Sequence, residues 1–165
     1  MSYMEVVPLT SKHYPAVKAI FEAGIATKNA TFTTEAPNWN EWDAQHLSIC
    51  RFVVLDAKEV VGWVALMPFS NVPAYKGVAE ISIYIAESYR NKGVGKKLLE
   101  TLIHEAESNF IWMLQAKIFP ENKASIALHK HFGFRVVGVF EQIGQLDNNW
   151  RDVVLMERRS QLVGL

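Results

Sequence analysis

The sequence predicts an α/β fold in which a mixed sheet of six to seven strands is flanked by about four helices. Two observations carry this prediction. Short apolar or alternating runs typical of strands occur throughout the chain, and runs with helical spacing separate them. The 165 residues are half hydrophobic and 21% charged, which suffices to bury one core. We therefore expect a single domain over residues 1–165.

The first third of the chain contains a strand and two helices. Residues 6–9 form a short strand at a sheet edge, where Pro8 is tolerated. Thr10 or Ser11 caps the first helix, whose apolar residues recur every three or four positions. The run 38–49 opens with the spacing of a capping box, which predicts the second helix.

The rest of the chain alternates between strands and helices. The predicted strands are apolar or alternating and lie at residues 52–55, 60–67, 79–87, 112–119, 134–143 and 150–158. The predicted helices span about 93–108 and 122–132, and Gly133 ends the second of them. The first two of these strands are joined by four residues and form a hairpin. This order predicts helices on both faces of the sheet.

Composition excludes several classes of protein. The net charge of zero lacks the electrostatic footprint of a nucleic-acid-binding protein, and no apolar run is long enough to cross a bilayer. Residues 1–5 lack the features of a signal peptide, and the single cysteine, Cys50, fits a reducing compartment as a buried structural thiol. His13, His46 and His104 lack metal-ligand spacing. We expect a cytoplasmic protein without a metal.

The segment 89–97 is the most informative part of the chain. It joins the strand 79–87 to a helix through Gly93 and Gly95, and several basic residues surround these glycines. Free N–H groups and the helix dipole at such a junction favour phosphate. The spacing fits neither the Rossmann fingerprint nor the P-loop. The segment predicts a diphosphate site.

Two motifs identify a resemblance. Arg90-x-x-Gly93-x-Gly95 is followed about 30 residues later by Asn122-x-x-Ser125 and a histidine near the helix end. This pair resembles the GCN5-related N-acetyltransferases (GNAT), and the resemblance implies the GNAT fold and acetyl-coenzyme A (acetyl-CoA) as cosubstrate. The residues that it places against the coenzyme are Ile83, Tyr84, Ile85, Arg90, Asn91, Lys92, Gly93, Val94, Gly95, Lys96, Asn122, Ser125 and His131.

Acetyl transfer to an amine requires the neutral amine, so a base must remove the proton of the ammonium. On the strand 79–87, alternation places Glu80 on one face with Ser82 and Tyr84. In the resembling family a glutamate here is the candidate base; the structural alternative is an ion pair with a lysine. The resemblance makes His129 the acid that protonates the leaving thiolate in a direct attack without an acyl-enzyme. Alternatively, His129 is a packed histidine that bonds a carbonyl.

Within that superfamily, the chain is most similar to the phosphinothricin and methionine-sulfoximine acetyltransferases, which implies a small amino-acid-like amine as acceptor and a homodimer. Those enzymes carry an arginine in the loop that corresponds to 68–77, where this chain has only Lys76. Phe32, Tyr75 and Lys76 are expected beside the acceptor, and Trp39 and Trp42 in the core. The alternatives are a peptide or protein amine as acceptor, or an acetyl-CoA sensor without chemistry.

Overall fold

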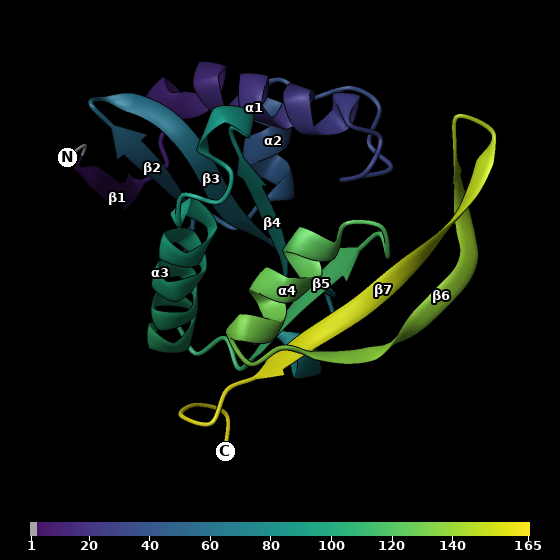
Figure 1. Cartoon of the computed structure of the whole chain (residues 1–165). Helices are drawn as coiled ribbons and strands as arrows, with labels where there is room; N and C mark the ends of the chain where they lie inside the picture. Colours follow the sequence, from purple (N-terminus) through teal and green to yellow (C-terminus); the bar gives the residue numbers. More distant parts are fainter. Residues whose placement is uncertain (1–2) are drawn as a thin grey trace.

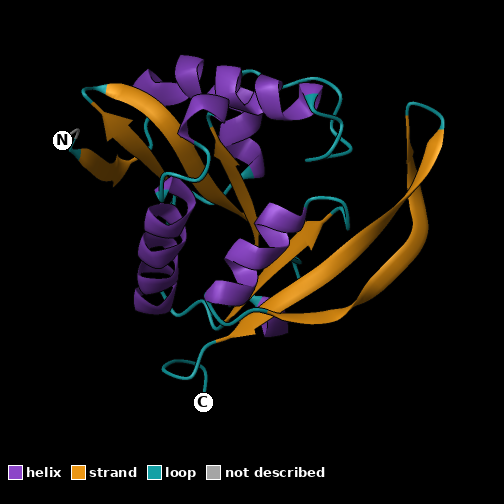
Figure 2. Cartoon of the chain, in the orientation of Figure 1, coloured by secondary structure: helices purple, strands orange, loops and turns teal. Residues whose placement is uncertain are grey.

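The computed structural model describes residues 3–165, so Met1 and Ser2 lie outside it. One sheet has the strand order β1-β2-β3-β4-β5-β7-β6 (Figures 1 and 2). Its strands are β1 (Met4–Pro8), β2 (Phe52–Asp56), β3 (Glu59–Pro68), β4 (Val78–Ile85), β5 (Met113–Ile118), β6 (Arg135–Leu146) and β7 (Asn149–Arg159). The β4–β5 pair is parallel and the other neighbours are antiparallel, which confirms the predicted mixed sheet.

Helices cover both faces of the sheet. They are α1 (Tyr14–Ala26), α2 (Trp39–Gln45), α3 (Val94–Ser108) and α4 (Lys123–His131), and the short 3-10 helices are η1 (Ser11–His13), η2 (Pro73–Tyr75) and η3 (Glu87–Tyr89). On one face, α1 and α2 pack with the β2 residue Val53 and the β3 residue Trp63. On the other face, α3 packs with Val54 and Val64, and α4 packs partly buried apolar side chains against the same cluster. Adjacent residues such as Val53 and Val54 serve opposite faces because side chains alternate along a strand.

Several predicted ends differ from the structure: β1 spans Met4–Pro8 rather than 6–9, β6 extends to Leu146 rather than 143, and two further ends have a visible cause. The second helix was expected to reach about residue 49, but α2 ends at Gln45 because His46 is extended and the Leu47 N–H donates to the Leu66 carbonyl of β3 at 2.7 Å. The strand expected over 79–87 ends at Ile85, and η3 follows. In both places the apolar periodicity continues past the true end of the element. The backbone instead bonds to a neighbouring strand in the first case and enters a 3-10 turn in the second.

Buried side chains match most of the predicted core. Trp42 is fully buried, and Trp39 packs against the same cluster. Cys50 is buried, and burial, together with the nearby Glu105 carboxylate, raises its thiol pKa to about 11. This confirms the expected structural thiol, because the reactive thiolate is scarce at neutral pH. Within residues 3–165, no helix combines the length and apolar character that crossing a bilayer requires.

The sheet opens between β4 and β5. These strands pair only from Val78–Met113 to Glu80–Gln115, although β4 continues to Ile85 and β5 to Ile118. Beyond Glu80, β4 is paired with β3 alone, so its other backbone edge has no strand partner. An unpaired strand edge offers N–H and C=O groups to a ligand with an amide-like chain.

Candidate active site

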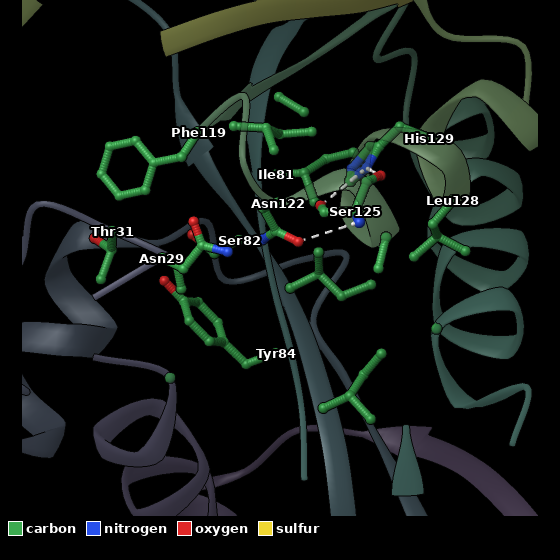
Figure 3. A pocket seen from close by; sticks show the side chains of 18 of the residues that line it. Asn29, Thr31, Ile81, Ser82, Tyr84, Phe119, Asn122, Ser125, Leu128 and His129 are labelled. Atoms are coloured by element: carbon green, nitrogen blue, oxygen red, sulfur yellow. Dashed lines mark hydrogen bonds between the residues drawn. The ribbon is translucent and has the colours of Figure 1, made fainter. Parts of the chain in front are cut away.

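A cavity of about 1210 Å³ lies at the opening between β4 and β5. Its walls come from the segment after α1, from β4 and β5, from the loop before α3, and from α4 and the β6–β7 hairpin. Figure 3 shows Asn29, Thr31 and Tyr84 on one side of β4, with Ser125, Leu128 and His129 of α4 across from them. A single space therefore connects the N-terminus of α3 with the polar face of β4.

The N-terminus of α3 has the properties of an anion site. Gly93 is its N-cap, with φ of 82° in the left-handed region, and no side chain caps the helix. The first turn contains no acidic residue, so the free N–H groups and the positive end of the dipole are available to a ligand. Arg90 and Lys96 also line the cavity here. This end of the cavity suits a diphosphate.

Gly95 allows α3 to lie close to its neighbours. A Cβ atom at this position would stand 2.9 Å from Ile85 Cδ1 and from Leu128 Cδ2. Glycine therefore lets the first turn of α3 approach the end of β4 and α4, which places the free N–H groups on the cavity wall.

The polar face of β4 supplies the one acidic side chain among the described residues of the cavity wall, Glu80. Its carboxylate lies 3.3 Å from Lys117 Nζ of β5, and the Glu80 side chain is 22% exposed. Further along the same face, Tyr84 stacks on Trp63, and burial raises its phenol pKa to about 12. The Tyr84 side chain is thus held in place by packing, whereas the Glu80 carboxylate is accessible to a ligand in the cavity.

His129 is held by the helix on which it stands. Its Nδ1 lies 2.7 Å from the Ser125 carbonyl, so in the neutral ring Nδ1–H donates and Nε2 carries the lone pair. The residue is 1% exposed, and Nε2 has no partner. Burial lowers the pKa of His129, an effect that the Ser125 carbonyl partly opposes. Nε2 can therefore donate a proton only from the protonated ring.

We expect His129 to remain neutral at pH 7. Because its folded pKa lies below the ordinary value of 6.5, the unfolded chain takes up a proton first as the pH falls. The associated stability is fully present above about pH 6.5 and is lost as the pH falls through the folded pKa. Nitrogen-15 NMR of the imidazole should show an Nδ1–H tautomer that titrates below 6.5. A ring that is already protonated at pH 7 would contradict this assignment.

The structure brings most of the predicted site residues to this cavity. Those that line it are Phe32, Glu80, Ile83, Tyr84, Ile85, Arg90, Asn91, Gly93, Val94, Gly95, Lys96, Asn122, Ser125, His129 and His131. Three do not. Lys92 lies with Nζ 5.1 Å from the centre of the Tyr89 ring, Tyr75 packs against Phe69, and neither Tyr75 nor its neighbour Lys76 lines the cavity. No residue of the 68–77 loop lines the cavity, and the loop contains η2, which the sequence analysis did not anticipate.

Sequence reasoning also missed several wall residues. Phe119 packs edge to face against Phe32 with ring centres 4.9 Å apart, and Asn29 and Thr31 come from the loop after α1. Lys117 had a usable signal: it lies two residues after Gln115 on a strand, so both point to one face. The partner strand could not be known from one sequence. Among residues 3–165, no group of three or more His, Cys, Asp or Glu side chains could hold a metal ion.

Comparison with known proteins identifies the family. Residues 17–134 match the model of the acetyltransferase (GNAT) family. The chain belongs to this family, as the paired motifs predicted. Its sheet and flanking helices are likewise those of solved GNAT proteins, such as the N-acetyltransferase of Staphylococcus aureus, with a TM-score of 0.86 and 28% identity over 96% of this chain and 99% of that one.

Individual relatives are more informative about the subgroup. The Bacillus subtilis protein YwnH is 34% identical over 87% of this chain and 91% of its own length. The L-methionine sulfoximine/L-methionine sulfone acetyltransferase of Pseudomonas paraeruginosa is 34% identical over 61% of this chain and 59% of that protein. A phosphinothricin acetyltransferase from Sinorhizobium meliloti, solved in complex with AcCoA, has a TM-score of 0.88 and 25% identity, covering 98% of this chain and 90% of that one.

Proposed function

We propose that this protein is an acetyl-CoA-dependent N-acetyltransferase that acetylates the primary amine of a small amino-acid-like substrate. The observation that carries the proposal is one continuous cavity that joins an uncapped helix N-terminus to a carboxylate, Glu80, across an open strand edge. The S. meliloti relative, which was solved with AcCoA, supports the choice of coenzyme. The P. paraeruginosa relative, named for methionine sulfoximine and methionine sulfone, supports the choice of acceptor.

The residues present suit acetyl-CoA. The N–H groups of the first turn of α3, with Arg90 and Lys96, would hold the diphosphate. The unpaired edge of β4 over residues 83–85 would pair with the amide-bearing arm of the coenzyme, and Asn122 and Ser125 would border it. Bound there, the coenzyme supplies an activated acetyl group as a thioester.

The chemistry that we propose is direct attack. Glu80 accepts a proton from the substrate ammonium, and the freed amine attacks the thioester carbonyl. The carbon–nitrogen bond forms, the carbon–sulfur bond breaks, and the thiolate leaves with the electron pair. Nδ1–H of His129 is held by the Ser125 carbonyl, so Nε2 can protonate this thiolate only in the minor fraction of molecules whose ring has first taken up a proton from solvent; otherwise the thiolate takes its proton from water. No acyl-enzyme forms, so acetyl-CoA alone should leave the mass of the protein unchanged.

The coenzyme site is tested by replacing Gly93 with alanine. A Cβ at this position has open space, so the cost comes from the left-handed backbone, about 1–2 kcal/mol. We expect this strain to turn the first N–H groups away from the diphosphate and to lower affinity for acetyl-CoA by about tenfold or more. Isothermal titration calorimetry measures this affinity. Gly138→Ala is the matched control, because its Cβ also has open space but its φ is not positive. Equal affinities for the two variants would contradict the site.

We also propose a cytoplasmic homodimer formed through the β6–β7 hairpin. The hairpin projects from the body of the molecule, as Figure 1 shows, and β6 is the edge strand of the sheet. Its exposed apolar side chains include Val136, Val137, Val139 and Trp150. A long apolar edge without a partner favours association. Light scattering after gel filtration should give twice the chain mass of 18.7 kDa, and Val139→Lys should reduce it to one chain. A monomeric parent protein would refute the dimer.

A further inference from the structure

The cavity contains one opposed pair of charges away from the diphosphate end. Among the described wall residues, the charged side chains are Glu80 and Lys117 at the opening of the sheet and Arg90 and Lys96 near α3. Lys117 Nζ lies 3.3 Å from Glu80 Oε2. The cation next to the candidate base is therefore Lys117 rather than Lys76, which does not line the cavity.

The strand register places Lys117 on the acceptor side. Gln115 is the register partner of Glu80, and Lys117 follows two residues later, so all three point to the same face of the sheet. That face also carries Tyr84, which packs with α1. Since the strands diverge after Glu80, the Lys117 side chain lies across the opening with no neighbouring backbone between it and the carboxylate.

Lys117 is free to exchange its partner. Its side chain is 49% exposed, and an ion pair at such a position contributes little to stability. The nearby Arg151 is different, because its guanidinium donates to the Lys28 carbonyl at 2.7 Å, pairs with Glu121 and covers the Phe119 ring. Arg151 fixes the loop after α1, whereas Lys117 is available to a ligand.

We propose that Lys117 determines the acceptor class by binding the α-carboxylate of a free amino acid while Glu80 faces its ammonium group. This inference rests on the proposed function and deepens it. In a free amino acid the ammonium and the carboxylate are attached to the same α-carbon. The molecule can therefore insert between Lys117 and Glu80 and replace their ion pair with two, one to each side chain. The N-terminal amine of a peptide or the side-chain amine of a lysine residue within a chain has no free carboxylate on its α-carbon and leaves Lys117 without a partner.

The test compares two acceptors in Lys117→Met and Lys117→Arg. L-Methionine sulfone carries the carboxylate, and its α-carboxamide has the same side chain and amine without that charge. The Lys117→Met variant keeps an apolar side chain of similar length, and the Lys117→Arg variant keeps the positive charge. Because the side chain is 49% exposed, neither replacement disturbs the core. Initial rates of thiol release give kcat and KM for each combination of protein variant and acceptor, and calorimetry gives the affinity of each variant for acetyl-CoA.

The proposal predicts that Lys117→Met raises KM for methionine sulfone by about 10- to 100-fold, which is the range expected for one charged hydrogen bond. The carboxamide should change by less than about twofold, and Lys117→Arg should restore much of the preference for the acid. Equal losses for both acceptors would overturn the proposal, because Lys117 would then act only through Glu80. A parent protein that turns over the carboxamide as well as the acid would overturn it too, while leaving acetyl transfer established. Failure to bind acetyl-CoA or to release thiol with any amine would instead refute the proposed function.

Discussion

Glu80→Gln is expected to lower kcat for acetyl transfer by about 10²- to 10⁴-fold, the usual contribution of a general base. Glutamine keeps the shape of the side chain but cannot accept the proton of the ammonium. Because Glu80 lines the cavity at the proposed acceptor side and does not belong to the N-terminus of α3, affinity for acetyl-CoA should be unchanged. Thiol release at saturating concentrations of both substrates measures kcat, and calorimetry measures the affinity.

Glu121→Gln is the matched control for this experiment. Glu121 also pairs with a basic side chain, Arg151 at 3.3 Å, but it does not line the cavity. Its replacement should leave kcat within about twofold, because it removes an exposed ion pair of little energetic weight. If Glu80→Gln retained the parent kcat, the carboxylate would be a structural partner of Lys117 and another group would deprotonate the amine.

Trp42→Ala should have the largest effect on stability. The indole is fully buried, and it packs with four rings, those of Tyr14, Trp39, His46 and Trp63. Truncation to alanine removes these contacts and leaves a cavity, at a cost of about 3–5 kcal/mol in the free energy of unfolding. Urea denaturation monitored by far-ultraviolet circular dichroism measures the change.

Trp42→Phe separates packing from the polar atom of the indole. Nε1 of Trp42 is buried and has no hydrogen-bond partner, so phenylalanine removes an unpaired N–H while it keeps an aromatic ring. This variant should therefore lose clearly less stability than Trp42→Ala. Two variants of equal stability would show that the aromatic cluster tolerates the cavity, contrary to the packing seen in the structure.

Local signals predicted the elements that carry the coenzyme motifs. The glycine before α3 and the Asn122 cap of α4 act within a few residues, and the structure has Gly93 and Asn122 as the N-caps of these helices. Alternation along β4 correctly separated Glu80 from the isoleucines that pack toward α3. Such features depend on neighbours in sequence, which is why one sequence was enough to predict them.

Features that depend on distant strands could not be predicted in the same way. The pairing of β4 and β5 stops at Glu80 and brings Lys117 to its carboxylate, a contact between residues 37 positions apart in the chain. Without the strand register, Lys76 was the only cation that the 68–77 loop suggested for the acceptor. The proposed acceptor side of the cavity therefore depends on tertiary structure, whereas the proposed coenzyme side depends on local motifs.

The central claim is most directly tested by thiol release from acetyl-CoA in the presence of a panel of amines. The panel contains L-methionine sulfone, L-methionine sulfoximine, phosphinothricin, a polyamine and a short peptide, and mass spectrometry identifies each product. We predict turnover with the amino-acid analogues, each gaining one acetyl group on its amine. Tight binding of acetyl-CoA without thiol release for any amine, or acetylation of the peptide alone, would contradict the account.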